Sequence, residues 1–393
     1  MPVEPERLDF IDGLRGMAIL GVMMVHTSEI ALRPLSGWML KIALEATHGV
    51  QLFYLASAFT LLFSYHTRKS DHCFRISGFY IRRFFRIAPL FYLAMIVYLL
   101  VDGFEPRYYA PNGIKWWHIL TTATFTNGWF PTAITSIITG GWSVAIEMNF
   151  YLFLPLCFKY VTTLNRALWF TLIALMFHLL FCKVAAPIFL PLFPPNHHYL
   201  IFFFLNILSL PAQIGVFGLG FIFFHLFFSL QPPPVKETDP ARKSKSLIFF
   251  MIFFYLIAAL LTTEFQLRTY ILFPRHFVYG IAFLIFAYAL SLYPSPIFVN
   301  QLTKRIGEIS YSMYLIHPLI LKMIKKMTGG ITIPFHQDIR FLLAFGSLVL
   351  LTYALSSITH TYIEKPGMAL GRRIIAQMEK RSTAHHSLFE RYR

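Results

Sequence analysis

Arg15 and His26 lie in the first strongly apolar stretch of the chain, where ionisable side chains are costly. Ten residues separate them. At ~100° per residue, eleven steps complete about three helical turns, so both side chains project from one face, roughly 16 Å apart along the axis. A cation near one membrane boundary and a titratable imidazole at depth indicate a functional track through the bilayer.

Glu147 is the second candidate for chemistry, about one and a half turns into the apolar segment that opens with GGWSVAIE. A carboxylate at that depth needs a partner or a proton. We expect Glu147 and His26 in the same outer half of the membrane, where the pair would act as a general base with an orienting carboxylate. The alternative is a structural glutamate, bonded to Trp142, Ser143 or a loop amide.

Arg82, Arg83 and Arg86 form a basic cluster at the start of a later apolar run, in FYIRRFFRIAPL. Arg83 and Arg86 are three residues apart and share a helical face. Arginines bind phosphates through bidentate, charge-assisted hydrogen bonds, so the cluster suits a phosphorylated ligand. The alternative is an anchor at the cytoplasmic boundary that contacts lipid headgroups.

A fourth group lies in RIGEISYSMYLIHPLILKMIKK. We expect Ser310, Tyr311 and Tyr314 to face other helices and His317 to lie at mid-depth. His317 precedes Pro318, so it either satisfies a carbonyl that the proline frees or has a functional role. The candidate substrate-binding residues are Trp142, Ser143, Tyr311 and His317.

Composition defines the elements that must position these residues. The 393-residue chain is 56% hydrophobic and only 13% charged, whereas soluble proteins carry about 25% charged residues. We therefore predict an all-α polytopic membrane protein. Its net charge of +16 comes from basic residues between apolar runs, which favours membrane orientation over nucleic-acid binding. Cys73, Cys157 and Cys182 have no metal-binding spacing, and no metal is expected.

About ten apolar runs are long enough to span a bilayer. They are Phe10–Ile30, Gly49–Tyr65, Ile87–Asp102, Trp142–Val161, Ala167–Ala186, Leu200–Leu230, Leu247–Thr263, His276–Tyr293, Ile306–Met327 and Ile339–Tyr362. Trp116–Trp129 is short and polar, which predicts a re-entrant or interfacial segment. Leu200–Leu230 is over-long and contains Pro211, which predicts a kink or a break.

Basic loops predict the orientation. Lys and Arg concentrate in His66–Arg86, in Gln231–Ser246 and after Glu364, all on the N-terminal side if ten runs span. The positive-inside tendency puts both termini in the cytoplasm and the protein in the inner (plasma) membrane. No cleavage site follows the first run, so that helix is expected to be retained. We divide the chain into a membrane domain, 1–366, and a basic tail, 367–393.

Together these segments resemble the acyltransferase 3 family of membrane-bound acyltransferases. The resemblance rests on LDFIDGLRGMAILGVMMVH, which carries the Arg–ten residues–His signature at Arg15 and His26, and on the arginine pair of RRFFRIAPL. WSVAIEMNFYLFLP places the family glutamate at Glu147. GEISYSMYLIHPL and YIEKPG are similar to two C-terminal blocks, so the resemblance covers about Leu8–Gly367.

The resemblance implies O-acylation, most often acetylation, of a carbohydrate such as lipopolysaccharide O-antigen, with cytoplasmic acetyl-CoA as donor. Some relatives carry an additional extracytoplasmic hydrolase-like domain, which we do not expect here. Under this hypothesis Arg82, Arg83 and Arg86 hold the coenzyme phosphates and Arg15 lies deeper. His26 then deprotonates the acceptor hydroxyl, or carries the acyl group itself. The competing interpretation is a proton-coupled transporter or flippase.

Overall fold

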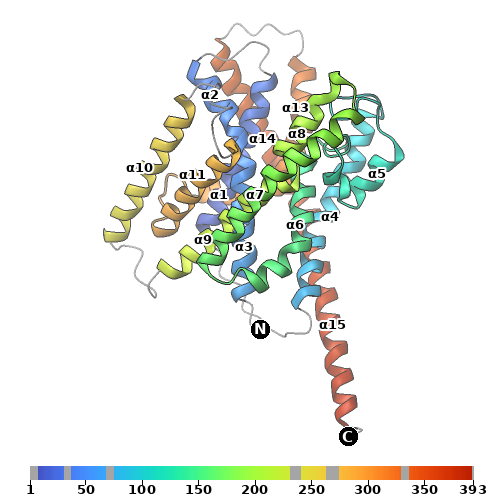
Figure 1. Ribbon diagram of the computed structural model, residues 1–393, viewed down its shortest axis with the longest axis vertical. Helices are drawn as coiled ribbons and strands as arrows, with labels where there is room; N and C mark the ends of the chain where they lie inside the picture. The colour runs from blue at the N-terminus through green and yellow to red at the C-terminus, as the bar shows by residue number, and fades with distance from the viewer. Residues whose placement is uncertain are drawn as a thin grey trace.

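The chain forms a bundle of helices, and the computed structural model describes residues 8–30, 37–67, 75–230, 240–262, 274–328 and 336–391 (Figure 1). Within these residues every regular element is helical, so the predicted fold class is confirmed. The long helices are α1 (Asp9–Ile30), α3 (Gly49–Thr67), α4 (Arg75–Asp102), α6 (Gly141–Tyr160), α7 (Leu164–Phe189), α9 (Leu210–Leu230), α10 (Pro240–Thr262), α11 (Arg275–Leu292), α13 (Ser310–Thr328), α14 (Gln337–Thr359) and α15 (Lys365–Arg391). Shorter helices are α2 (Gly37–Glu45), α5 (Trp116–Ala123), α8 (His198–Phe203) and α12 (Gln301–Glu308).

In the described part of the chain, nine helical stretches are long and apolar enough to cross a bilayer, against about ten predicted. The predicted run Ile306–Met327 accounts for the difference. It is divided between α12 and α13, and α13 carries Lys322, Lys325 and Lys326 toward its end. α13 still packs inside the bundle, against α1 and α14.

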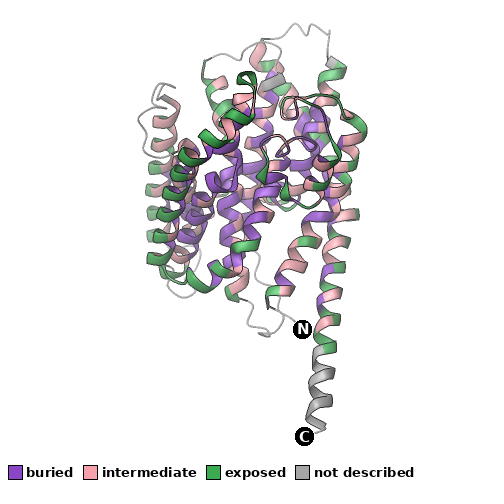
Figure 2. Ribbon diagram, turned by 45° about the vertical axis from the view of Figure 1, so that its right-hand side comes forward, coloured by how far each residue is buried: buried purple, intermediate pink, exposed green. Residues whose placement is uncertain are grey.

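The outer surface of the bundle is apolar. Ile173 and Met176 on α7, and Met251 and Tyr255 on α10, are all more than half exposed. Figure 2 shows buried residues gathered along the axis of the bundle, with exposed residues on its flanks. Apolar side chains on this scale are accommodated where the surrounding solvent is lipid. The protein is therefore a multi-pass membrane protein.

α1 is held between two neighbouring helices by glycine contacts. Gly307 of α12 lies so close to the backbone of Asp12 that a Cβ on that glycine would overlap it. On another side, Gly49 of α3 lies against the backbone of Ala18. These close approaches fix the depth and rotation of α1, and with them the direction of the Arg15 side chain.

The predicted break at Pro211 is confirmed. α8 ends in a π-helical turn, η6 (Phe204–Leu208), and Ser209 is extended before α9 begins. Pro211 has no N–H to donate to the carbonyl four residues earlier, that of Ile207. The side-chain amide of Gln213 donates to this carbonyl instead, at 2.7 Å. The broken backbone is thus satisfied inside the protein, as a low-dielectric surrounding requires.

The predicted re-entrant or interfacial segment forms α5 and a short turn, η3 (Thr126–Trp129). α5 has eight residues, so it is about 12 Å long and cannot cross a core of ~30 Å. Asn149 of α6 fastens this segment. Its amide donates to the carbonyl of Phe125 at 2.9 Å and its oxygen accepts from the indole of Trp129 at 3.0 Å.

The segment 367–393, predicted as a basic tail, is helical in its described part. α14 runs through a π-helical turn, η8 (His360–Glu364), into α15. Gly367 and Gly371 lie against Phe85 of α4. Beyond this contact α15 leaves the bundle, at the end where α4 begins (Figure 1).

Candidate active site

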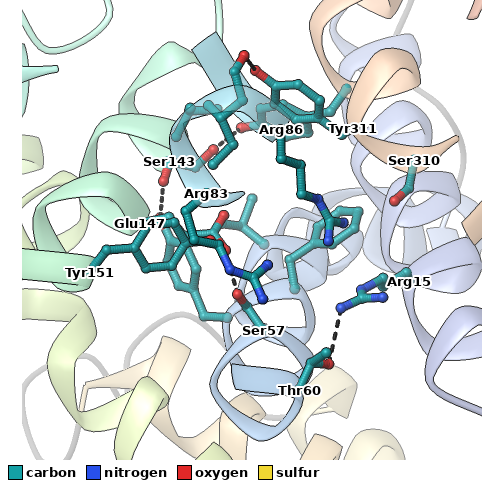
Figure 3. A pocket seen from close by; sticks show the side chains of 16 residues that line it. Arg15, Ser57, Thr60, Arg83, Arg86, Ser143, Glu147, Tyr151, Ser310 and Tyr311 are labelled. Carbon is teal, nitrogen blue, oxygen red and sulfur yellow. Dashed lines mark hydrogen bonds between the residues drawn. The ribbon is translucent and has the colours of Figure 1, made fainter. Parts of the chain in front are cut away.

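A cavity opens inside the bundle between α1, α3, α4, α6 and α13 (Figure 3). It encloses about 730 Å³, including the space at its mouth. It is lined by Arg15, Val50, Phe53, Tyr54, Ser57, Thr60, Arg83, Arg86, Ile87, Ser143, Val144, Glu147, Tyr151, Ser310, Tyr311 and Tyr314. Twelve of these sixteen residues bear a charged or hydroxyl group, which is unusual for the interior of a membrane protein.

Three guanidinium groups converge on the cavity. Arg83 and Arg86 come from one face of α4, and Arg15 reaches in from α1 (Figure 3). Arg15 donates a 3.0 Å hydrogen bond to the hydroxyl of Thr60 and lies 3.5 Å from the carboxylate of Asp12. Because the side chain of Arg15 is only 15% exposed, its charge is largely withdrawn from water and available to an anion.

Glu147 is the carboxylate of the cavity lining, and two hydroxyls hold it. Ser57 donates to Oε1 from α3, and Tyr151 donates to the same oxygen at 2.6 Å from one turn further along α6. Figure 3 shows Glu147 beside Ser57 and Arg83. The lining thus carries three cations and one carboxylate, and this positive excess favours an anionic ligand.

Tyrosine and serine hydroxyls of the cavity lining are joined by hydrogen bonds. Ser143 donates to the hydroxyl of Tyr314 at 2.7 Å, and Tyr314 donates to the carbonyl of Gly140 at 2.9 Å. Tyr54 donates to the carbonyl of Ser143 at 3.2 Å. Gly140 has φ +79°, a left-handed conformation that glycine adopts without strain.

His26 and His317 form a pair of rings next to Tyr314. Their ring centroids are 5.3 Å apart, and the ring of Tyr314 lies 5.9 Å from that of His317. His317 is 1% exposed. Neither histidine lines the cavity. Tyr314 is therefore the residue between the three arginines and the histidine pair.

The structure brings together most of the candidate residues and separates a few. Arg15, Arg83, Arg86, Ser143, Glu147 and Tyr311 line the cavity. Tyr311 donates to the carbonyl of Ile87 at 2.8 Å. Arg82 and Trp142 lie outside the lining, where the indole of Trp142 packs edge-on against Tyr54.

The expected contact between His26 and Glu147 needs correction. Glu147 has Ser57 and Tyr151 as hydrogen-bond partners, whereas the ring of His26 lies against His317. The reason is that the chain before α6 is already folded into the bundle, with Gly140 bonded to Tyr314. Seven residues after Gly140, Glu147 reaches the cavity that the arginines line.

Ser57, Thr60 and Tyr151 were not among the predicted site residues. Ser57 and Thr60 are three residues apart in a largely apolar helix, so they share a face, and Tyr151 lies four residues after Glu147. This spacing is the sequence feature that could have identified these three residues. A serine or threonine in a membrane helix usually bonds its own backbone, which weakens that signal.

A family model for an acyltransferase domain, acyltransferase 3, matches residues 8–361. The chain belongs to this family. The matched region contains the described site from Arg15 to Tyr314 together with both histidines of the pair. Glu364 follows the matched region. It is buried, accepts from Ser312 and lies 3.2 Å from Nδ1 of His360.

Curated relatives agree with membership of the acyltransferase 3 family. Acyltransferase MdmB of Streptomyces mycarofaciens is 29% identical over 177 residues, 43% of this chain and 44% of the relative. O-acetyltransferase OatA of Staphylococcus aureus is 24% identical over 96% of this chain and 60% of the relative. The chain thus spans about half the length of these two relatives.

A viral protein matches over a similar share of its own length and of this chain. The putative acetyltransferase ORF330 of Acidianus two-tailed virus is 24% identical over 79% of this chain and 82% of its own length. No solved structure matches the chain significantly. Family membership thus confirms the resemblance to the acyltransferase 3 family that the sequence motifs indicated.

Proposed function

We propose that this protein transfers an acetyl group from acetyl-CoA to a hydroxyl of a cell-surface carbohydrate, of which lipopolysaccharide O-antigen is one example. The observation that carries the proposal is the convergence of Arg15, Arg83 and Arg86 on a cavity inside a membrane bundle. The name of the staphylococcal relative, an O-acetyltransferase, supports transfer to oxygen.

The arginines would bind the phosphates of the donor. A guanidinium presents a planar set of N–H donors that matches two phosphate oxygens, and each such charge-assisted bond contributes roughly 1.5–3 kcal/mol. Arg83 and Arg86 come from the first half of α4, near the end of the bundle that we propose faces the cytoplasm. The donor would therefore enter from the cytoplasm, where acyl-CoA is made.

The spacing of α1 would place the thioester near His26. Arg15 and His26 are eleven positions apart on one continuous helix, which is about 16 Å of rise. The extended pantetheine arm separates phosphate from sulfur by a comparable length. With phosphates at Arg15 the arm would pass Tyr314, so Tyr314 must move aside when the donor binds.

His26 can serve first as base and then as acid in the proposed reaction. His26 removes the proton from the acceptor hydroxyl, whose oxygen forms a bond to the thioester carbonyl carbon. The carbon–sulfur bond then breaks, and His26 returns the proton to the departing sulfur, which leaves as free CoA thiol. The alternative route passes through an acyl group on a nitrogen of His26, which the acceptor then attacks.

The membrane orientation forms part of the proposal. The basic residues at the start of α4 and along α15 lie at one end of the bundle, and the positive-inside tendency assigns that end to the cytoplasm. The acceptor would then approach from the other side. We place the protein in the inner (plasma) membrane, with membrane lipids and a carbohydrate acceptor, lipid-linked or free, as its partners and no nucleic acid.

The proposal is tested with the purified protein in lipid nanodiscs, radiolabelled acetyl-CoA and O-antigen polysaccharide freed of acetyl groups by alkali. We expect label on the polysaccharide and an equal amount of free CoA thiol. A transporter or flippase would leave the thioester intact. Absence of thiol release across a panel of deacetylated envelope glycans would refute the transferase proposal.

A further inference from the structure

We propose that His317 positions His26 for catalysis, by accepting a hydrogen bond from the His26 ring when that ring becomes protonated. This inference rests on the proposed function, because it assigns a role within that reaction. It gives His26 an imidazole partner in place of the carboxylate that the sequence suggested.

The tautomer of His317 follows from its contacts. Nδ1 lies 3.1 Å from the carbonyl oxygen of Met313, one turn earlier on α13. A carbonyl only accepts, so Nδ1 carries the hydrogen. The ring is 1% exposed and forms no ion pair with a described carboxylate, and such a buried ring is neutral. A neutral imidazole has one ring hydrogen, so Nε2 presents a lone pair.

Nε2 of His317 is buried and has no hydrogen-bond partner among the described residues. An unsatisfied buried acceptor costs about 1–3 kcal/mol, and one in a native protein calls for an explanation. Satisfaction in a state other than the resting one is such an explanation. The required partner is a donor that turns toward Nε2 during the reaction.

His26 is the neighbour that can supply this N–H donor. Its ring centroid lies 5.3 Å from that of His317, with 35° between the planes. The other close ring, Tyr314, already donates its hydroxyl hydrogen to Gly140. As a base, neutral His26 takes the acceptor proton on one ring nitrogen, so the N–H on its other ring nitrogen is the donor that can turn toward His317.

The fit between the two rings is therefore better in the charged state than in the resting state. A hydrogen bond from the cationic ring is charge-assisted and stronger than one from the neutral ring, so it stabilises the transition state more than the ground state, which is the condition for a gain in rate. It also holds the ring in one orientation toward the thioester. Glu147 is unsuited to this role because Ser57 and Tyr151 hold it within the cavity, whereas the ring of His26 lies against His317.

Two variants of His317 separate positioning from packing. His317→Leu has similar bulk but no acceptor, whereas His317→Gln retains an amide oxygen that can accept. We expect kcat for acetyl transfer to fall at least about 100-fold in the leucine variant, and KM for acetyl-CoA to stay within twofold. The glutamine variant should recover at least tenfold of that loss.

The inference is overturned if the leucine variant keeps kcat within twofold of wild type, or if leucine and glutamine lose activity equally. Acetyl-CoA binding and the unfolding midpoint in detergent verify that each variant is folded. If the leucine variant does not fold, His317→Met provides the same comparison, with a flexible apolar side chain of similar volume.

A second measurement does not depend on turnover. ¹⁵N NMR of the histidine-labelled protein in nanodiscs reports which ring nitrogen is protonated, and the signals missing from His317→Gln belong to His317. We expect a protonated Nδ1 and a bare Nε2, and a protonated Nε2 would refute the inference. This result stands even if the wild type transfers no acetyl group, so failure of the proposed function and failure of the role of His317 are distinguishable.

Discussion

The hydroxyl of Ser143 donates a 2.7 Å hydrogen bond to that of Tyr314, which donates in turn to the carbonyl of Gly140 at 2.9 Å. These bonds join the start of α6 to α13 where the arginine-lined cavity ends and the histidine pair begins. The backbone at Gly140 is therefore part of the partition between the arginine-lined cavity and the ring of His26.

Gly140→Ala should destabilise the protein. At φ +79° an L-residue is strained by roughly 1–2 kcal/mol, and the added Cβ would lie 3.1 Å from the hydroxyl of Tyr314. We expect a lower unfolding midpoint in detergent. Gly346→Ala is the control, because a Cβ there meets nothing within 4 Å and alanine favours the helix. Equal destabilisation by both substitutions would contradict the assigned partition.

The neighbouring arginines of α4 should differ in their effect on donor binding. Arg83 and Arg86 line the cavity and Arg82 does not. We expect Arg83→Ala and Arg86→Ala each to raise the dissociation constant of acetyl-CoA about 10- to 100-fold, from the loss of a charge-assisted bond. Arg82→Ala should change it less than twofold, as measured by titration calorimetry in nanodiscs. A similar rise in the dissociation constant for all three variants would indicate that acetyl-CoA is attracted by surface charge without a specific site.

Removal of the carboxylate should tighten donor binding. Glu147→Gln keeps an oxygen that accepts from Ser57 or Tyr151 but leaves three cations with no carboxylate in the lining. The lost repulsion is on the order of 1 kcal/mol at an effective dielectric of 20, or about fivefold in affinity for acetyl-CoA. Glu308→Gln, at an exposed residue of α12, serves as control. Weaker binding by Glu147→Gln would show that the carboxylate contacts the donor directly.

Much of this architecture could be predicted from the sequence. The length of the apolar runs gave the helices, and Pro211 gave the break before α9. The shared face of Arg15 and His26 on α1 stays a prediction from eleven helical steps. Such features depend on local geometry and on the cost of unpaired backbone groups in lipid, which act on any sequence in the same way.

The partners of the buried polar groups could not be predicted in the same way. Whether Glu147 meets His26 or Ser57 depends on where α6 starts, and that depth is set by the folded chain between α4 and α6. Asn149 fastens this chain through Phe125 and Trp129, contacts with no periodic signature. Hydropathy determines which segments enter the membrane, and tertiary packing determines what the buried residues touch.

The central claim is that His26 performs the chemistry and the arginine cavity holds the donor. The most direct test measures acetyl transfer and acetyl-CoA binding in the same preparation of His26→Ala, with His336→Ala, an exposed site, as control. We predict that His26→Ala transfers acetyl groups at least about 100-fold more slowly while its dissociation constant for acetyl-CoA stays within twofold of wild type. Transfer at the wild-type rate by a folded His26→Ala protein would contradict the claim.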